Sequence, residues 1–138
     1  MRAEMRFDLP TPDYDTDEFW DGCREGELRI RHCNACGAFH FYPRPFCPKC
    51  WSTDVEWVAA SGRARLYTYS VVAANDLPPW PERVPYVAAI VELDEGPRMM
   101  TNVEGCAFDA LAIGMPLVVD FKDIGDDTTI AVFRPAPA

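Results

Sequence analysis

Cys33-Asn34-Ala35-Cys36 and Cys47-Pro48-Lys49-Cys50 are two C-x-x-C pairs separated by ten residues, and they decide how the middle of this chain folds. Each pair can form a tight turn that directs two thiolates toward one point, and tetrahedral zinc binds four such sulfurs at about 2.3 Å. Four thiolates leave no open coordination position for water, so the metal is expected to be structural. The spacing predicts a rubredoxin-like zinc ribbon whose metal-binding free energy forms part of its folding free energy.

Two alternatives to zinc remain open on the residues alone. The four thiolates of Cys33, Cys36, Cys47 and Cys50 would also hold iron, and a site without metal could form disulfides. His32 and His40 lie close to the turns, but four cysteines already complete the metal shell. Both histidines are therefore expected around the site or at the surface rather than as ligands.

Upstream of the ribbon, the segment from Asp15 to Gly26 predicts one short helix. Asp15 is the expected N-cap, with Glu18 three residues later, and Gly26 is a plausible stop. Cys23 falls on the same helical face as two aromatic residues, which predicts a buried thiol in the core.

Downstream of the ribbon, the composition changes near Ser61 to alternating β-branched and aromatic residues. Five strands are expected, which is the strand count of an OB-fold barrel. They are Arg63–Ala73, Pro85–Leu93, Arg98–Val103, Leu117–Lys122 and Thr128–Phe133. The prediction is a mainly β chain with a leader and helix at 1–27, a zinc ribbon at 28–60 and an OB-fold at 61–138.

The net charge of −9 argues against nucleic acid and anionic membranes as partners, because 22 acidic residues outnumber 13 basic ones. Residues 1–10 contain no apolar signal segment, and nowhere do about 18 apolar residues run together. We therefore expect a soluble cytoplasmic protein. A single-stranded nucleic-acid-binding module stays an alternative, since OB barrels recur in that role.

Nothing in the sequence predicts a catalytic constellation. Cys106 follows Gly105 in a loop and is the one cysteine available as a nucleophile, but no base is predicted beside it. We expect a half-buried structural thiol there. A free-standing acyl-CoA hydrolase or transferase that uses Cys106 is the remaining enzyme hypothesis.

The order of several motifs resembles the DUF35 family, also described as zinc-ribbon OB-fold acyl-CoA-associated proteins. The resemblance covers about residues 16–135. After the helix, the motifs that carry it are Leu28–Gly37, Phe41–Cys50, Trp57, Ser61–Arg63, Tyr67–Ser70, Val91–Pro97, Ile113–Pro116 and Phe133–Pro135.

The resemblance implies a non-catalytic accessory subunit that partners a thiolase-fold enzyme and helps to form its coenzyme A thioester site. Such enzymes include lipid-transfer-type thiolases that act as retro-aldolases in steroid side-chain degradation, and other acyl-CoA thiolase or acyltransferase complexes. It also implies a heterocomplex, for instance a heterotetramer of two chains of each kind, and association with a MaoC-like hydratase in the steroid group.

A coenzyme A nucleotide is a polyanion, so its binding would require a local basic patch within an acidic chain. The candidates flank the ribbon or open the barrel, and they are Arg29, Arg31, Arg44, Lys49, Arg63 and Arg65. The stiff apolar loop Leu77-Pro78-Pro79-Trp80 is the expected partner interface, because a polyproline-like segment loses little entropy on docking. A loop folded back over the barrel mouth is the alternative.

Overall fold

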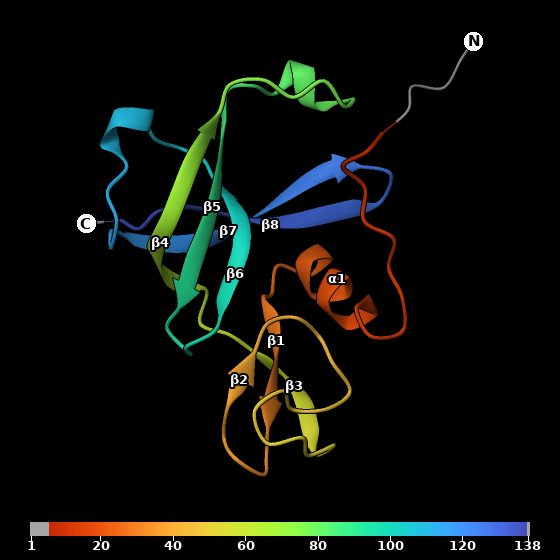
Figure 1. The fold of residues 1–138 in the computed structure, drawn as a ribbon. Coiled ribbons are helices and arrows are strands. Elements are labelled where there is room, and N and C mark those ends of the chain that lie inside the picture. The colour runs from red at the N-terminus through yellow and green to blue at the C-terminus, as the bar shows by residue number, and fades with distance from the viewer. Residues whose placement is uncertain (1–5, 138) are drawn as a thin grey trace.

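The computed structural model describes residues 6–137 of the chain, in which one helix and a three-stranded ribbon lie against a five-stranded barrel (Figure 1). The mainly β architecture predicted from the sequence is confirmed. No helix within residues 6–137 is long and apolar enough to cross a membrane.

The ribbon sheet contains β1 (Arg29–Cys33), β2 (Phe39–His40) and β3 (Val55–Ala59) in the order β2-β1-β3, with both pairs antiparallel. Leu28 and Ile30 are fully buried, as the alternating pattern before the first cysteine pair requires. Cys33 is the last residue of β1, Cys36 lies in the turn after β1, and Cys47 and Cys50 lie in the connection between β2 and β3.

The barrel is closed in the order β4-β5-β6-β8-β7. Its strands are β4 (Arg63–Val72), β5 (Tyr86–Leu93), β6 (Arg98–Val103), β7 (Pro116–Gly125) and β8 (Thr128–Pro135). All pairs are antiparallel except β6 with β8, which meet at Val103 and Phe133. Short 3-10 turns lie at Trp80–Glu82 and Phe108–Ala110.

The five predicted strands are therefore all present; Arg98–Val103 has the predicted bounds, and the other four differ at one or both ends. β7 runs three residues beyond the predicted Lys122, because Asp126 and Asp127 adopt positive φ angles of 51° and 55° and reverse the chain in a tight hairpin. Consecutive positive φ angles favour Asn, Asp or Gly, which explains the acidic turn.

Thr16 is the N-cap of helix α1 (Asp17–Arg24), so the prediction of Asp15 as N-cap is wrong by one residue. Asp13 organises this start, because its Oδ1 accepts hydrogen bonds from the backbone N–H groups of Asp15 and Thr16, both at 3.0 Å. The helix ends at Arg24 with Glu25 as its C-cap, and Gly26 follows with a φ of 77°, which confirms it as the predicted stop.

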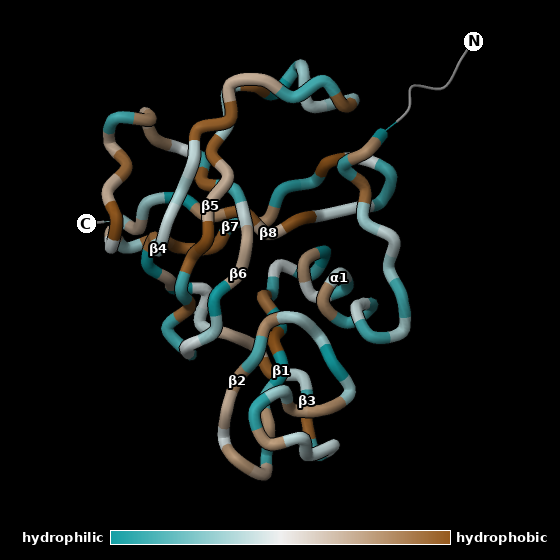
Figure 2. The backbone as a smooth tube through the Cα atoms, in the orientation of Figure 1, coloured by the Kyte–Doolittle hydropathy of each residue, from teal (hydrophilic) through white to brown (hydrophobic). Residues whose placement is uncertain are grey.

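Helix α1 packs against β8, β7 and β1, so it contacts both the barrel and the ribbon. Phe19 is 7% exposed and the predicted core thiol Cys23 is 1% exposed. Both lie in one cluster of buried side chains that continues through Ile30 into Leu66 and Phe133 of the barrel. Figure 2 shows hydrophobic positions, in brown, along β1 and β5, and the buried cluster makes the core continuous across the ribbon and the barrel.

The connection from ribbon to barrel is short and tied down. Ala60 donates a backbone hydrogen bond to Leu28 at 2.7 Å, and Ser61 donates one to the Glu95 carboxylate at 2.8 Å. Gly62 has a φ of 82°, and a Cβ at that position would lie 2.7 Å from the Val119 side chain. Glycine is therefore required here both for its backbone angle and for its lack of a side chain.

Candidate metal centre and basic cavity

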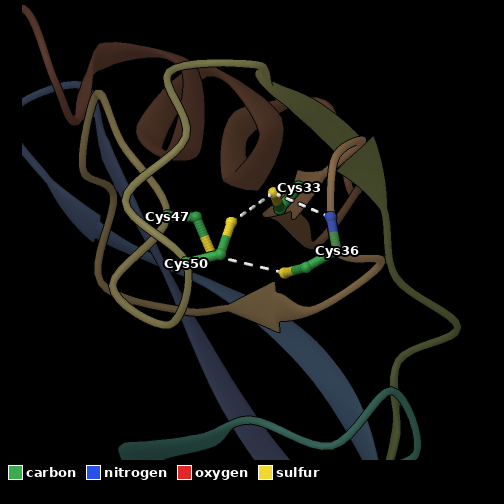
Figure 3. Close-up of side chains that lie close together, drawn as sticks. All are labelled: Cys33, Cys36, Cys47 and Cys50. Atoms are coloured by element: carbon green, nitrogen blue, oxygen red, sulfur yellow. Dashed lines mark hydrogen bonds between the residues drawn. The ribbon is translucent and has the colours of Figure 1, made fainter.

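The four cysteine sulfurs converge as the sequence predicts, from the end of β1, the turn after it and the turn after β2 (Figure 3). All four lie within 4.8 Å of one another, with 3.5 Å between Cys33 and Cys50 and 3.6 Å between Cys36 and Cys47. A tetrahedron with metal–sulfur bonds of about 2.3 Å has sulfurs about 3.8 Å apart, so the spacing fits zinc.

Backbone N–H groups in each turn point at a sulfur. The N–H of Cys36 lies 3.4 Å from the Cys33 sulfur, and the N–H of Lys49 lies 3.4 Å from the Cys47 sulfur. The backbone N–H groups of Cys50 and Lys49 lower the pKa of Cys47 to about 7, whereas burial and the neighbouring thiols raise the pKa of Cys50 to about 12. A bound zinc would supply a structural cross-link and no reaction centre.

The two turns have the same backbone shape but different exit residues. Gly37 follows the first turn with a φ of 80°, whereas Trp51 follows the second with a φ of 67°. A positive φ is unfavourable for a bulky residue. The Trp51 ring stacks on Phe46 at 5.3 Å between centroids, and this contact holds the second turn in shape.

Neither histidine belongs to the sulfur cluster among the described residues. His32 Nδ1 lies 3.3 Å from the side-chain oxygen of Asn34 near the surface. His40 is 8% exposed, and neither ring nitrogen has a hydrogen-bond partner within residues 6–137. Burial, together with the charges of Arg31 and Arg44, lowers the pKa of His40 and keeps its ring neutral near pH 7.

Arg31 and Arg44 are the two candidate basic residues that share a cavity. This ribbon cavity has a volume of about 480 Å³ and lies between the ribbon and the segment before α1. Arg31 is opposite His40 on one neighbouring strand and opposite Trp57 on the other, so the three side chains form a row across the sheet. The Arg31 guanidinium lies 4.8 Å from the Trp57 ring, and its Nε is buried without a hydrogen-bond partner within residues 6–137.

Acidic groups also line the ribbon cavity, namely Asp15, Asp17 and Glu18. The cavity therefore combines two guanidinium groups and an aromatic ring with three carboxylates. Sequence reasoning missed Trp57 and His40 as neighbours of Arg31, because the sheet register that aligns them is set by the loops between the strands.

The other four candidate basic residues lie elsewhere. Arg29 is paired with Glu18, Glu25 and Glu27, and these carboxylates hold its guanidinium. Arg63 pairs with Asp94 at 3.1 Å, and Arg65 donates to the backbone oxygen of Gly114 at 3.0 Å. Lys49 lies exposed within the second cysteine turn.

The loop predicted as a partner interface has two different faces. Leu77 is 52% exposed, whereas Trp80 is half-buried and packs on Tyr86 with 5.0 Å between ring centroids. The Phe7 backbone N–H donates a hydrogen bond to the Pro78 carbonyl at 2.9 Å, so the segment before α1 is bonded to this loop.

Both parts of the chain match known family models. Residues 20–56 match the model described as "ChsH2, rubredoxin-like zinc ribbon domain", and residues 57–122 match "ChsH2, C-terminal OB-fold domain". Together the two models cover the ribbon and most of the barrel in the order observed here.

Three curated relatives carry different names. The probable enoyl-CoA hydratase alpha subunit of Thermomonospora curvata is 42% identical over 130 residues, which are 92% of this chain and only 40% of that protein's length. The DUF35 domain-containing scaffold protein of Methanocaldococcus jannaschii is 39% identical, with 69% of this chain and 67% of that protein covered. The benzoylsuccinyl-CoA thiolase subunit BbsA of Thauera aromatica is 32% identical, with 56% and 52% covered.

A solved structure described as "Ltp2-ChsH2(DUF35) aldolase" contains a chain that is similar over almost its whole length. The TM-score is 0.82 at 37% sequence identity, with 92% of this chain and 98% of that chain covered. With both domains matched in order and a solved DUF35 subunit covered from end to end, the chain belongs to the DUF35 family of ChsH2-like proteins, in which a rubredoxin-like zinc ribbon precedes an OB-fold barrel.

Proposed function

We propose that this chain is a non-catalytic accessory subunit of a thiolase-fold enzyme that acts on acyl-CoA thioesters. The observation that carries the proposal is the similarity of this chain to a chain in a solved aldolase complex, 98% of which is covered. Within that class we favour a retro-aldolase of steroid side-chain degradation. A thiolase complex is the second candidate, supported by the similarity to a benzoylsuccinyl-CoA thiolase subunit.

In this proposal the ribbon cavity helps to bind the coenzyme A nucleotide. Arg31 and Arg44 offer donors for phosphate oxygens, and the Trp57 ring offers an apolar face beside them. Three carboxylates in the same cavity oppose a polyanion. The subunit alone should therefore bind coenzyme A weakly, and cations of the enzyme partner would complete the site.

The partner is proposed to be a lipid-transfer-type thiolase-fold enzyme, bound in a heterocomplex such as a heterotetramer in the cytoplasm. The exposed Leu77 and the half-buried prolines after it offer an apolar edge for docking. A MaoC-like hydratase is a further proposed partner. The relative described as a hydratase alpha subunit, of which this chain spans 40%, supports that association.

The test of the proposed function is co-expression with the thiolase-fold protein encoded beside this chain, followed by purification through a tag on this chain alone. We expect a stable complex that cleaves or forms a carbon–carbon bond in an acyl-CoA thioester, with an activity that the thiolase-fold subunit lacks alone. Retro-aldol cleavage supports the aldolase, and thiolysis supports the thiolase. An inactive mixture that separates on gel filtration would contradict the accessory role.

Replacing Arg31 or Arg44 with glutamine should weaken binding of the CoA thioester to that complex. Each change removes a charged donor, so the KM should rise by about tenfold or more. Complex formation and zinc content should stay unchanged. Arg63→Gln is the matched control, because the Arg63 side chain is 69% exposed and already pairs with Asp94. An unchanged KM in both cavity variants would exclude this cavity from the CoA site.

A further inference from the structure

A second cavity, distant from the ribbon, opens at the mouth of the barrel. It has a volume of about 350 Å³ and lies between the β4–β5 loop, the segment after β6 and the β7–β8 hairpin. We call it the barrel-mouth pocket. Among its lining residues are Trp80, Tyr86, Asn102, Cys106, Phe108 and Ile130. In Figure 1 the β4–β5 loop is at the top of the molecule and the ribbon at the bottom.

Rings and aliphatic side chains supply the walls of this pocket. Trp80 and Tyr86 form a tilted pair on one side, and Phe108, which is 41% exposed, stands among the other lining residues. Ile124 and Ile130 come from the two strands of the hairpin. Such walls favour an apolar ring or a branched alkyl group by burial of its surface.

The charged groups that line the pocket are already neutralised by the protein. Arg83 pairs with Asp8 at 2.9 Å, and Lys122 pairs with Glu104 at 2.9 Å. An anionic ligand would compete with these carboxylates for the two cations, so the pocket favours a neutral group. In this respect it differs from the ribbon cavity, where Arg44 and Arg31 have no ion pair within residues 6–137.

The segment before α1, through Arg6 and Asp8, holds the β4–β5 loop beside the pocket in place. The Asp8 side chain is only 2% exposed, and it accepts hydrogen bonds from Arg6 at 2.8 and 3.1 Å as well as pairing with Arg83. Arg6 also donates to the backbone oxygen of Ile124 at 2.7 Å. The segment thus ties the β4–β5 loop to the β7–β8 hairpin, and the bonds from Arg6 and then Arg83 lower the pKa of Asp8.

We propose that the barrel-mouth pocket is a binding site for a neutral small molecule, or the neutral part of one, that presents a ring or branched alkyl group. Its volume lies at the lower end of the range of about 300–1,000 Å³ typical of small-molecule sites. Four stretches of chain, within residues 80–87, 102–108, 122–124 and at Ile130, line it, and the buried Asp8 carboxylate holds the β4–β5 loop beside it. The inference goes beyond the proposed function, since it involves neither the ribbon cavity nor the enzyme partner.

Two fluorescent probes with the same ring system test the charge selectivity. N-phenyl-1-naphthylamine is neutral, and 8-anilino-1-naphthalenesulfonate adds one sulfonate to the same rings. The zinc-loaded full chain should bind the neutral probe at least about tenfold more tightly, a difference of about 1.4 kcal/mol. Ile124→Trp fills the pocket and should weaken that binding by about tenfold or more. Ile113→Trp is the matched control, because Ile113 is 64% exposed and outside the pocket.

Alkylation of Cys106 gives a second readout that does not depend on a filled variant folding. Cys106 lines the pocket and is partly exposed, whereas Cys23 is 1% exposed and burial raises its pKa to about 12. The saturating neutral probe should slow the reaction of Cys106 with N-ethylmaleimide at least about fivefold, measured by mass spectrometry. Equal binding of both probes, tighter binding of the sulfonate, or no protection of Cys106 would overturn the proposal.

Discussion

Cys47→Ser should abolish stoichiometric zinc binding and unfold the ribbon, which is the largest effect expected from a single change in this protein. The substitution removes one of four converging sulfurs, and the ribbon has little other core of its own beyond Leu28 and Ile30. Because metal-binding free energy in such a site is folding free energy, losing the metal removes about 10 kcal/mol from the ribbon. Zinc content measured by mass spectrometry should fall from one atom per chain to below a tenth.

The same variant should also lose binding of the CoA thioester, because Arg31 and Trp57 of the ribbon cavity lie on the sheet that the metal stabilises. Cys106→Ser is the matched control, since it makes the same chemical change at a thiol outside the sulfur cluster. It should keep full zinc and a cooperative thermal transition. A Cys47→Ser protein that keeps both would contradict a structural four-thiolate centre.

Phe133→Ala should destabilise the barrel by about 3–5 kcal/mol, a large fraction of the 5–15 kcal/mol typical of a folded domain. Phe133 is fully buried, and its strand pairs with β7 on one side and with β6 on the other. The Phe133 carbonyl accepts a hydrogen bond from Glu104 at 2.8 Å beside that junction. Truncating the ring leaves a cavity where the barrel closes, so the melting temperature should fall by on the order of 10 °C or more.

Phe108→Ala provides the comparison for this change, because the same side chain is removed from a position that is 41% exposed. Its effect on the free energy of unfolding, measured by urea titration, should stay below about 1 kcal/mol. Equal losses for the two variants would mean that the packing of Phe133 is not what closes the barrel.

The cysteine spacing and the strand pattern could be predicted because both depend on neighbours close in sequence. Two C-x-x-C turns fix their own geometry locally, and the period-two alternation of β5 from Val87 to Leu93 marks its buried face. The end of α1 followed from Gly26 for the same reason. The N-cap did not, because Thr16 and Asp13 share the local hydrogen bonds that were assigned to Asp15.

The remaining features depend on residues far apart in sequence, and the sequence pattern contained no signal for them. Arg29 and Arg31 look alike as neighbours on one strand, but α1 and the turn after it bring three carboxylates to Arg29 and none to within ion-pair distance of Arg31. Within residues 6–137, Arg6 is likewise the one local partner of Asp8, and only the fold brings Arg83 to it. Long-range placement therefore decides which charges stay available to a ligand.

The tied connection at residues 60–62 gives the molecule a mechanical property. The connection is fixed by hydrogen bonds from Ala60 and Ser61. Gly62 also lies close to Val119, so the linker has little freedom to move. The ribbon and the barrel therefore keep one fixed relative orientation and do not move as independent domains. A protein that binds the ribbon therefore also fixes the orientation of the barrel. Each part can then contact a different neighbour at a fixed angle.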